Sequence, residues 1–442
     1  MRAATTPLNW TSRTLQAASA ATTSSGATAL LSLHCAANVC HSLCMMQRFS
    51  HGTCPFTAGT RRTDEPYPGR EALRSAGPVV LAEAPAGGPV AIVTTAALAR
   101  VVLADPRFVK DTAWAPPEWD PRAAELEPTA AQALSLTTTE GAPHAALRRA
   151  HAPMLSPRRM RARRGAMRDT ARGLLAERGE GPVDLMADFT TRYPLAVVGD
   201  LLGVPRAMLD EAVEACRRMF GDEADVAAAM GGFARLAATA MQHEGLAREL
   251  RERLPADVTD EQVHYLLFTL LFVGQLTTGP ALGFVLARVL AEGDGAQRSS
   301  TRGEGTGPGG DTAALVDDVL RRDPPAPFTL WRFSAQEVEL AGVVLPPRTP
   351  VLVDLAGSAD DPGAGPGPGL AFGAGPHLCA AVHLARAELV AAVDVLVGDF
   401  PDARLAVPAA DLRRVDPGGI AGSRLAALPV EGLRPRECSG SS

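Results

Sequence analysis

One cysteine near the C-terminal end stands in a setting that favours metal binding. Residues 370–379 read Leu-Ala-Phe-Gly-Ala-Gly-Pro-His-Leu-Cys, and Gly373 and Gly375 allow a tight loop with positive φ. A helical pattern begins shortly after Cys379, and a helix N-terminus favours a thiolate over a thiol. Because no second cysteine or paired histidine stands nearby, the segment cannot form a tetrahedral zinc site. A single thiolate can form one axial bond to haem iron.

The order of residues around this cysteine is specific. Phe372-Gly-x-Gly-x-His377-x-Cys379, followed by Leu384-Ala-Arg386, resembles the haem-binding loop of the cytochrome P-450 family. The resemblance covers about residues 54–430 and implies that Cys379 is the iron ligand of haem b. It also places three loop residues at the cofactor: Phe372, Gly373 and Gly375. Without this frame, a lone cysteine would be interpreted as a buried structural residue.

Several cationic residues match the same family in the expected order. Pro143-His144-Ala-Ala-Leu-Arg148 resembles its third-helix motif, and the stretch from Asp323 leads to Arg332. The resemblance implies that the haem propionates are bound by His144, Arg148, Arg332 and His377. Such groups suit two buried carboxylates, which are otherwise costly to desolvate. The alternative for the helical pair is a solvent-exposed histidine and arginine on one face.

The longest apolar pattern spans residues 260–290, and its centre, 265–272, is apolar all round. This predicts a helix through the middle of the protein. Residues 273–278 resemble the oxygen-activation segment of the family. The resemblance implies that Gly274 opens space beside the iron and that Thr277 takes part in a proton relay. The alternative is that Thr277 and Thr278 donate to carbonyls four residues earlier, which is compatible with the first interpretation.

Four departures from the family pattern raise the possibility of a weakened or repurposed member. Leu276 replaces the acid that precedes the threonine, and Ala381 replaces a glycine. Asp318-Val-Leu-Arg321 occupies the place of the family's Glu-x-x-Arg pair, with Asp instead of Glu. The segment 361–369 is shorter than the corresponding segment of the family and lacks its arginine. Because that arginine normally joins the Glu-x-x-Arg pair, we expect Arg321 to be left without a partner.

The elements that position these residues are mostly helical. Apolar spacing predicts helices over residues 71–76, 95–103, 144–154, 160–178, 185–202, 207–220, 260–290, 313–322 and 384–397. Strands are predicted over 79–82, 90–94, 338–340 and 351–353. Residues 109–140 are expected to form a long irregular loop, in which Trp114 and Trp119 either line a substrate pocket or hold the loop in place.

Composition excludes several classes of protein. Of 442 residues, 46% are hydrophobic and 21% charged, with a net charge of −6, so a core can form and nucleic acid is not an expected partner. No run of about 18 apolar residues occurs, which argues against a membrane span. The seven cysteines are odd in number and scattered, as in a protein of the reducing cytoplasm.

We expect a single domain over residues 54–434. Residues 1–53 are predicted to be a disordered leader or the result of a mis-assigned start, and residues 435–442 a disordered tail. The cluster of His34, Cys35, Cys40, His41 and Cys44 fits no zinc pattern. The basic run 158–164 is either a solvated face or a docking surface for an acidic electron donor.

The resemblance implies a mainly α protein with a small β region, in which the long helix lies over haem and the cysteine loop below it. It implies a monooxygenase that inserts one oxygen atom from O2 into an organic substrate, such as a secondary metabolite. A separate ferredoxin or flavodoxin would supply the electrons. Two alternatives stay open: a helper protein without oxygen activation, and a haem enzyme that uses peroxide or catalyses a non-oxygenation reaction.

Overall fold

The computed structural model describes residues 54–65, 68–121, 123–124, 133–179, 181–219, 225–293, 310–361 and 367–436. Residues Met46–Ser442 form one compact unit. The predicted leader, its His34–Cys44 cluster and residues 437–442 of the predicted tail lie outside the described residues.

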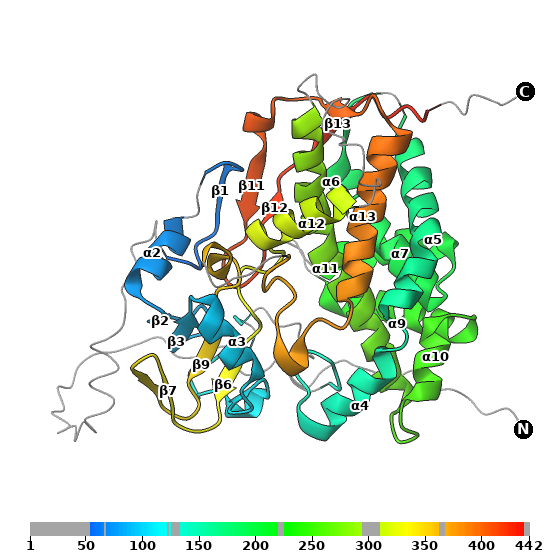
Figure 1. Cartoon of the computed structure of the whole chain (residues 1–442). Helices are drawn as coiled ribbons and strands as arrows, with labels where there is room; N and C mark the ends of the chain where they lie inside the picture. Colours follow the sequence, from blue (N-terminus) through cyan, green and yellow to red (C-terminus); the bar gives the residue numbers. More distant parts are fainter. Residues whose placement is uncertain are drawn as a thin grey trace, which may run out of the picture. The chain divides into compact units, whose positions relative to one another are not determined.

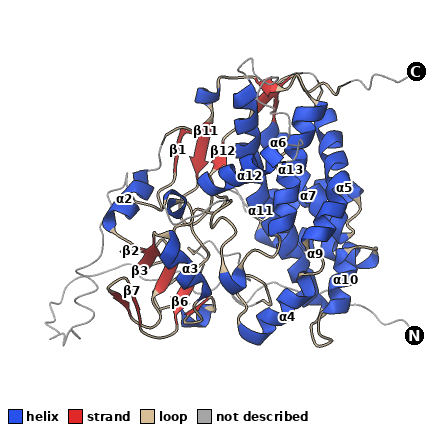
Figure 2. Cartoon of the chain, in the orientation of Figure 1, coloured by secondary structure: helices blue, strands red, loops and turns tan. Residues whose placement is uncertain are grey.

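Helices dominate the described chain (Figure 2). They are α2 (Pro68–Ala76), α3 (Ala96–Ala104), α4 (Gly141–His151), α5 (Pro157–Ala176), α6 (Leu185–Asp188), α7 (Arg192–Leu202), α8 (Leu209–Met219), α9 (Val226–Gln242), α10 (Leu246–Arg253), α11 (Asp260–Gly293), α12 (Gly310–Arg322) and α13 (Val382–Asp399). The mainly helical character predicted from the sequence is confirmed.

The long helix α11 is the central element of the helical part (Figure 1). Helices α7, α9, α12 and α13 all pack against it. Leu266, Leu267, Phe268 and Leu271 are buried, in keeping with the all-round apolar pattern. The helix continues through Pro280 to Gly293. By length and composition it could cross a membrane, but most of its apolar stretch is buried inside the protein, as in the core helix of a soluble protein.

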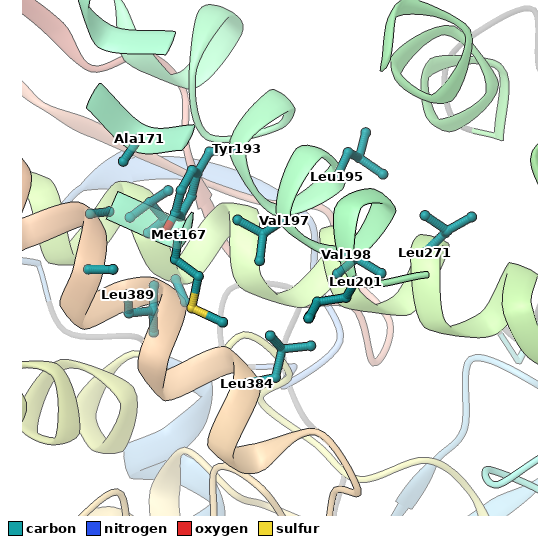
Figure 3. Packing of buried hydrophobic residues seen from close by; sticks show 14 of the residues in the cluster. Met167, Ala171, Tyr193, Leu195, Val197, Val198, Leu201, Leu271, Leu384 and Leu389 are labelled. Atoms are coloured by element: carbon teal, nitrogen blue, oxygen red, sulfur yellow. The ribbon is translucent and has the colours of Figure 1, made fainter. Parts of the chain in front are cut away.

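The main core forms where α7 and α13 pack on α11 and α5 packs on α7 and α13. Met167 and Ala171 of α5, Tyr193 of α7, and Leu384 and Leu389 of α13 point into one apolar layer (Figure 3). Burying side chains of this size contributes about 1.5–3 kcal/mol each. The packing fixes the position of α13, whose first turn follows the cysteine loop.

The strands form small sheets. They are β1 (Gly59–Arg62), β2 (Val79–Glu83), β3 (Pro89–Val93), β4 (Phe108–Val109), β5 (Val183–Asp184), β6 (Arg332–Ser334), β7 (Val338–Leu340), β8 (Val343–Leu345), β9 (Pro350–Val353), β10 (Arg404–Leu405), β11 (Arg413–Asp416), β12 (Arg424–Leu425) and β13 (Pro429–Glu431). The largest sheet has the order β2-β3-β9-β6-β4, with β3 and β9 parallel. It brings residues near position 110 beside the strand that begins with Arg332.

Most predicted elements are present, but one helix is divided, and two helices and the strands other than β2, β3, β7 and β9 were not predicted. The single helix predicted over 185–202 is two helices, because the chain breaks between α6 and α7. At the break, the carbonyl oxygen of Thr190 approaches α11 so closely that a Cβ on Gly279 would lie 2.9 Å from it. Helices α9 and α10 were not predicted. Gly231 and Gly232 weaken the helical signal of α9, yet Gly232 allows close packing on Ala215 of α8.

The long loop predicted over 109–140 contains only a short 3-10 turn at Thr112–Trp114 within its described residues. Its two tryptophans differ. Trp119 is buried and lies edge-on to Trp331 and Phe333, with ring centroids 5.9 and 5.3 Å away. Trp114 is 37% exposed. Trp119 therefore holds the loop against the sheet, which is the second of the two roles considered.

Candidate functional site

The cysteine loop is closed by its own backbone. The N–H of Cys379 donates to the carbonyl of Phe372 at 2.9 Å, and Gly373 and Gly375 have φ of +71° and +69°. A Cβ on Gly375 would lie only 2.3 Å from the carbonyl oxygen of Leu103 in α3. Gly375 is therefore required both for its backbone conformation and for the close approach of the loop to α3.

Burial controls the protonation of Cys379. It raises the pKa of the thiol, while the backbone N–H of Ala381 and the Arg148 guanidinium act in the opposite direction. The backbone N–H acts in the direction that the sequence argument gives, but desolvation, which the sequence does not show, outweighs it. A thiolate at this position needs a bound cation to replace its proton.

Two predicted histidines lie face to face beside the loop. The rings of His144 and His377 stack with centroids 4.1 Å apart and an interplanar angle of 25°. His377 Nδ1 lies 3.2 Å from the carbonyl oxygen of Leu136, and its Nε2 lies 3.2 Å from Glu140 Oε2. Burial, followed by His377 and Arg148, lowers the pKa of His144 to about 4. His144 Nε2 is buried and has no hydrogen-bond partner. It is free to interact with a further group.

The two predicted arginines differ in their surroundings. Arg148 donates to the carbonyl of Leu378 at 2.8 Å, which ties α4 to the residue before the cysteine. Arg332 begins β6 and is only 3% exposed. Burial lowers its pKa to about 10, and Glu140 acts in the opposite direction. The structure thus brings His144, Arg148 and His377 together at the loop. Glu140, which lies beside His377, also raises the pKa of Arg332 against the effect of burial.

Two charged residues of this site were missed by sequence reasoning. Glu140 accepts a hydrogen bond from the backbone N–H of Lys110 at 2.8 Å and lies beside His377. Although burial acts the other way, these contacts lower the pKa of Glu140. Lys110 is 7% exposed, and burial, together with Arg332, lowers its pKa to about 7. Neither residue stands in a motif used above, so the pattern gave no reason to single it out.

One face of α11 is open at mid-length. Val273 and Leu276 are 38% and 39% exposed, although the helix is mostly buried. Thr277 is on the same face, because residues three and four positions apart are neighbours on a helix. Its hydroxyl donates to the carbonyl of Val273 at 2.9 Å, as the back-bonding alternative predicts. A Cβ on Gly274 would lie 3.5 Å from Val198 of α7, so this glycine borders a neighbouring helix.

The departure at residues 318–321 is compensated locally. Asp318 contacts Arg321 one turn along α12 and Arg322 at 3.0 Å. The expectation that Arg321 would lack a partner is therefore wrong, because the two side chains are neighbours on one helix. The adjacent Asp317 binds Arg386 of α13 through two hydrogen bonds of 2.8 and 2.6 Å.

The basic run also has a structural role. Arg159 pairs with Glu249 at 2.6 Å, and Arg164 pairs with Asp394 at 2.6 Å. These pairs tie α5 to α10 and α13. Arg158 and Arg161 are exposed and make no ion pair within the described part of the chain. Only some of the run is therefore available to another molecule.

Comparison with known proteins agrees with this geometry. The chain is 37% identical over 425 residues to the cytochrome P-450 monooxygenase DoxA of Streptomyces sp. (strain C5), a match that covers 86% of this chain and 96% of DoxA. It is 30% identical over 404 residues to the cytochrome P450 monooxygenase PikC of Streptomyces venezuelae, over 84% and 92% of the two chains. No family model matches the sequence.

Solved structures lead to the same fold. CYP154C4 from Streptomyces sp. W2061 superposes with a TM-score of 0.72 at 26% identity, over 88% of this chain and 99% of that one. CYP154A1 from Streptomyces coelicolor A3(2) superposes with a TM-score of 0.69 at 25% identity, over 82% and 96%. The fold class predicted from the sequence is therefore confirmed.

The described residues fit the cofactor of this family, haem b, which is flat and apolar and carries two carboxylates. Val273 and Leu276 offer an open apolar surface on α11. His144 Nε2 is buried without a partner, and Arg332 makes no ion pair within the described residues. A buried cation such as Arg332 is stable only with an anion nearby. The chain belongs to the cytochrome P-450 family and is an oxidoreductase of the monooxygenase type with haem b as its cofactor.

Proposed function

We propose that Cys379 Sγ is the axial ligand of the haem iron and that the protein inserts one oxygen atom from O2 into an organic substrate. The observation that carries this proposal is the placement of a half-buried thiol in a closed loop just before α13, next to the residue that Arg148 contacts. When bound, haem supplies the activation of dioxygen. The protein supplies the thiolate, the orientation of the cofactor and the exclusion of water.

The residues around the loop would bind the cofactor. His144, Arg148, Arg332 and His377 would hold its carboxylates, while Phe372, Gly373 and Gly375 shape the loop. This assignment is supported by the stacked histidines and by the burial of Arg332. Charge-assisted hydrogen bonds from several donors would offset the cost of desolvating the carboxylates.

The open face of α11 would form the oxygen and substrate side of the site. Thr277 would hold a proton or a water molecule there, because its hydroxyl oxygen keeps acceptor capacity while it donates to Val273. Leu276 provides no acid, so the second proton would have to come from water or from the substrate. The exposed Val273 and Leu276 favour a mainly apolar substrate.

Relatives support an organic substrate of secondary metabolism. Among them are a vitamin D(3) 25-hydroxylase of Pseudonocardia autotrophica, 29% identical over 393 residues, and a 2-hydroxy-5-methyl-1-naphthoate 7-hydroxylase of Streptomyces carzinostaticus, 25% identical over 327 residues. Both names describe the hydroxylation of an organic molecule. The present chain would act on a molecule of similar character.

Electrons would come from a separate ferredoxin or flavodoxin in the cytoplasm. Arg149 on α4 and Arg158 and Arg161 on α5 are exposed and basic. Arg149 adjoins Arg148, which contacts the cysteine loop, and the other two follow on the next helix. An acidic donor docked there would be steered by charge.

The proposal is tested with the purified protein and Cys379→Ala. After reduction and addition of carbon monoxide, the wild type should show the red-shifted Soret band of a thiolate-ligated haem, and the variant should not. With a substrate identified by its spectral shift on binding, turnover under ¹⁸O₂ should place one labelled atom in the product. A protein that takes up no haem would indicate the helper function, and an unlabelled product would indicate peroxide or non-oxygenation chemistry.

A further inference from the structure

We propose that Lys110 is an additional cation of the haem carboxylate site and acts as a pair with Arg332. The inference rests on the proposed haem site and adds a residue that lies on neither the cysteine loop nor α4. It would donate to one cofactor carboxylate from the end of β4, while Arg332 donates from β6.

The sequence singles this residue out by composition. Of the 43 basic residues of the chain, Lys110 is the only lysine. If any cation sufficed at position 110, arginine would be expected there. A compact ammonium on a flexible stem differs from the broad guanidinium fork, and it fits where a second cation must lie beside an arginine.

The sheet brings the two cations together. Strand β4 pairs with β6 in the register Val109↔Phe333 and Phe108↔Ser334, so Lys110 continues from β4 toward the start of β6 at Arg332. Lys110 is 7% exposed and Arg332 is 3% exposed. Neither side chain makes a hydrogen bond or an ion pair with a described residue. Two adjacent buried cations thus lack a direct counter-ion.

The neighbouring charges do not balance this pair. Glu140 is the nearby carboxylate, and it is already engaged by His377 and by the backbone N–H of Lys110. His144 faces the same region, and the Lys110 charge helps to lower its pKa. When protonated, Lys110 adds a third positive charge to those of Arg332 and Arg148, against the single negative charge of Glu140. Two cofactor carboxylates would balance the difference.

A purely structural or solvated lysine would look different. A solvated lysine exposes its ammonium, and a structural buried lysine is paired with a carboxylate or several carbonyls. Lys110 is only 7% exposed and is not paired in this way, and desolvation lowers its pKa to about 7. An anion at the site would offset the cost of desolvating the ammonium. The lysine should therefore lower the stability of the apoprotein and raise its affinity for haem.

The proposal is tested by these two opposite effects, on the stability of the apoprotein and on the affinity for haem. Lys110→Met keeps most of the length of the side chain and removes the charge. We expect haem to dissociate from Lys110→Met to apomyoglobin at least about tenfold faster than from the wild type. We also expect the apoprotein of the variant to unfold at a higher denaturant concentration at pH 6. The exposed Arg107→Met, in the same segment and paired with Asp105, is the matched control and should change neither quantity.

A merely structural lysine would give the reverse pattern, with a less stable apoprotein and an unchanged rate of haem loss, and that result would overturn the proposal. The two proposals can fail separately. Cys379→Ala should lose the red-shifted band with carbon monoxide, whereas Lys110→Met should keep it and lose only affinity for haem. If Cys379→Ala retained the band, the proposed ligand would be wrong whatever the result at Lys110.

The single lysine allows a second, direct measurement. Reductive methylation with ¹³C-formaldehyde labels only Lys110 and the N-terminal amine, so each gives its own NMR signal. Bound haem should protect Lys110 from the reagent and leave the N-terminal amine equally reactive. Equal labelling of Lys110 with and without haem would contradict a direct contact.

Discussion

Leu276 is the residue at which this chain departs most clearly from the proton-relay pattern of its family. Its side chain is 39% exposed on the open face of α11, next to Thr277. Leu276→Asp should therefore place a solvated carboxylate beside the Thr277 hydroxyl without a large burial cost. We expect it to raise product formed per NADH consumed severalfold, a small part of the ~10²–10⁴ that a positioned acid contributes. Leu276→Asn is the isosteric control, and equal behaviour of the two variants would exclude a missing acid as the limiting factor.

Glu388 on α13 provides a test of burial in the main core. Burial raises the pKa of its carboxyl well above the ordinary value, and its Oε1 has no hydrogen-bond partner. The native protein then keeps a proton that the unfolded chain releases above about pH 4.5, so stability falls as pH rises from there. Glu388→Gln should remove this pH dependence, so the stability of the variant should increase relative to that of the wild type as the pH rises. Urea unfolding between pH 4.5 and 8.5 measures both, and parallel curves would contradict a buried neutral carboxyl.

At the residue level, motif residues could be predicted and their neighbours could not. Cys379, His144 and His377 stand in recognisable order, and the structure brings them to one place. Glu140 and Lys110 stand in no motif used above, because their proximity depends on the β4–β6 pairing and on where α4 begins. The raised thiol pKa of Cys379 was also unpredictable, since burial is a property of the folded chain.

At the level of elements, the contact between the cysteine loop and α3 depends on one glycine. Gly375→Ala adds a Cβ that would lie 2.3 Å from the carbonyl of Leu103, in addition to the strain of a positive φ. Gly373→Ala carries only the strain, about 1–2 kcal/mol, because its nearest neighbour lies 3.9 Å away. We expect Gly375→Ala to lose most of its haem and Gly373→Ala to retain it. Haem content per mole of protein measures this, and similar losses would show that the close approach to α3 is unimportant.

The link between α12 and α13 can be measured in isolation. Asp317 and Arg386 form a bidentate pair with side chains 16% and 36% exposed. A double-mutant cycle of Asp317→Asn and Arg386→Gln should give a coupling energy of about 1 kcal/mol. The exposed i,i+4 pair Arg248 and Glu252, at 3.5 Å, should give a coupling energy of only about 0.2–0.5 kcal/mol. Equal coupling energies would mean that the helix–helix link adds nothing to stability.

Long apolar patterns predicted their elements well, whereas local breaks did not follow from the pattern. The predictions for α11 and α13 hold because both helices are buried on most sides. The break between α6 and α7 depends on Thr190 approaching Gly279, a contact between residues far apart in the chain. Helix α9 depends similarly on Gly232 packing against Ala215, so its glycines are a packing feature that resembles a helix-breaking signal.

For the whole molecule, the unpaired arginines predict how an electron donor associates. Reversing the charge of Arg158 and Arg161 together should raise the KM for an acidic ferredoxin by roughly tenfold at low salt. The effect should fade as ionic strength rises, because exposed charges are screened over about 10 Å at 0.1 M salt. Arg217→Glu combined with Arg218→Glu, at two exposed arginines of α8, is the control with the same change in net charge. An equal effect of the control would mean that only net charge matters.

The axial bond from Cys379 underlies the account at every scale, and resonance Raman spectroscopy of the ferric protein observes that bond directly. Protein grown with ³⁴S-cysteine should show an iron–sulfur stretching band at lower frequency than unlabelled protein. The band should be absent from Cys379→Ser and present in Cys54→Ser and Cys216→Ser. A band that persists in Cys379→Ser, or one that does not move with the isotope, would contradict the assignment of this thiolate to the haem iron.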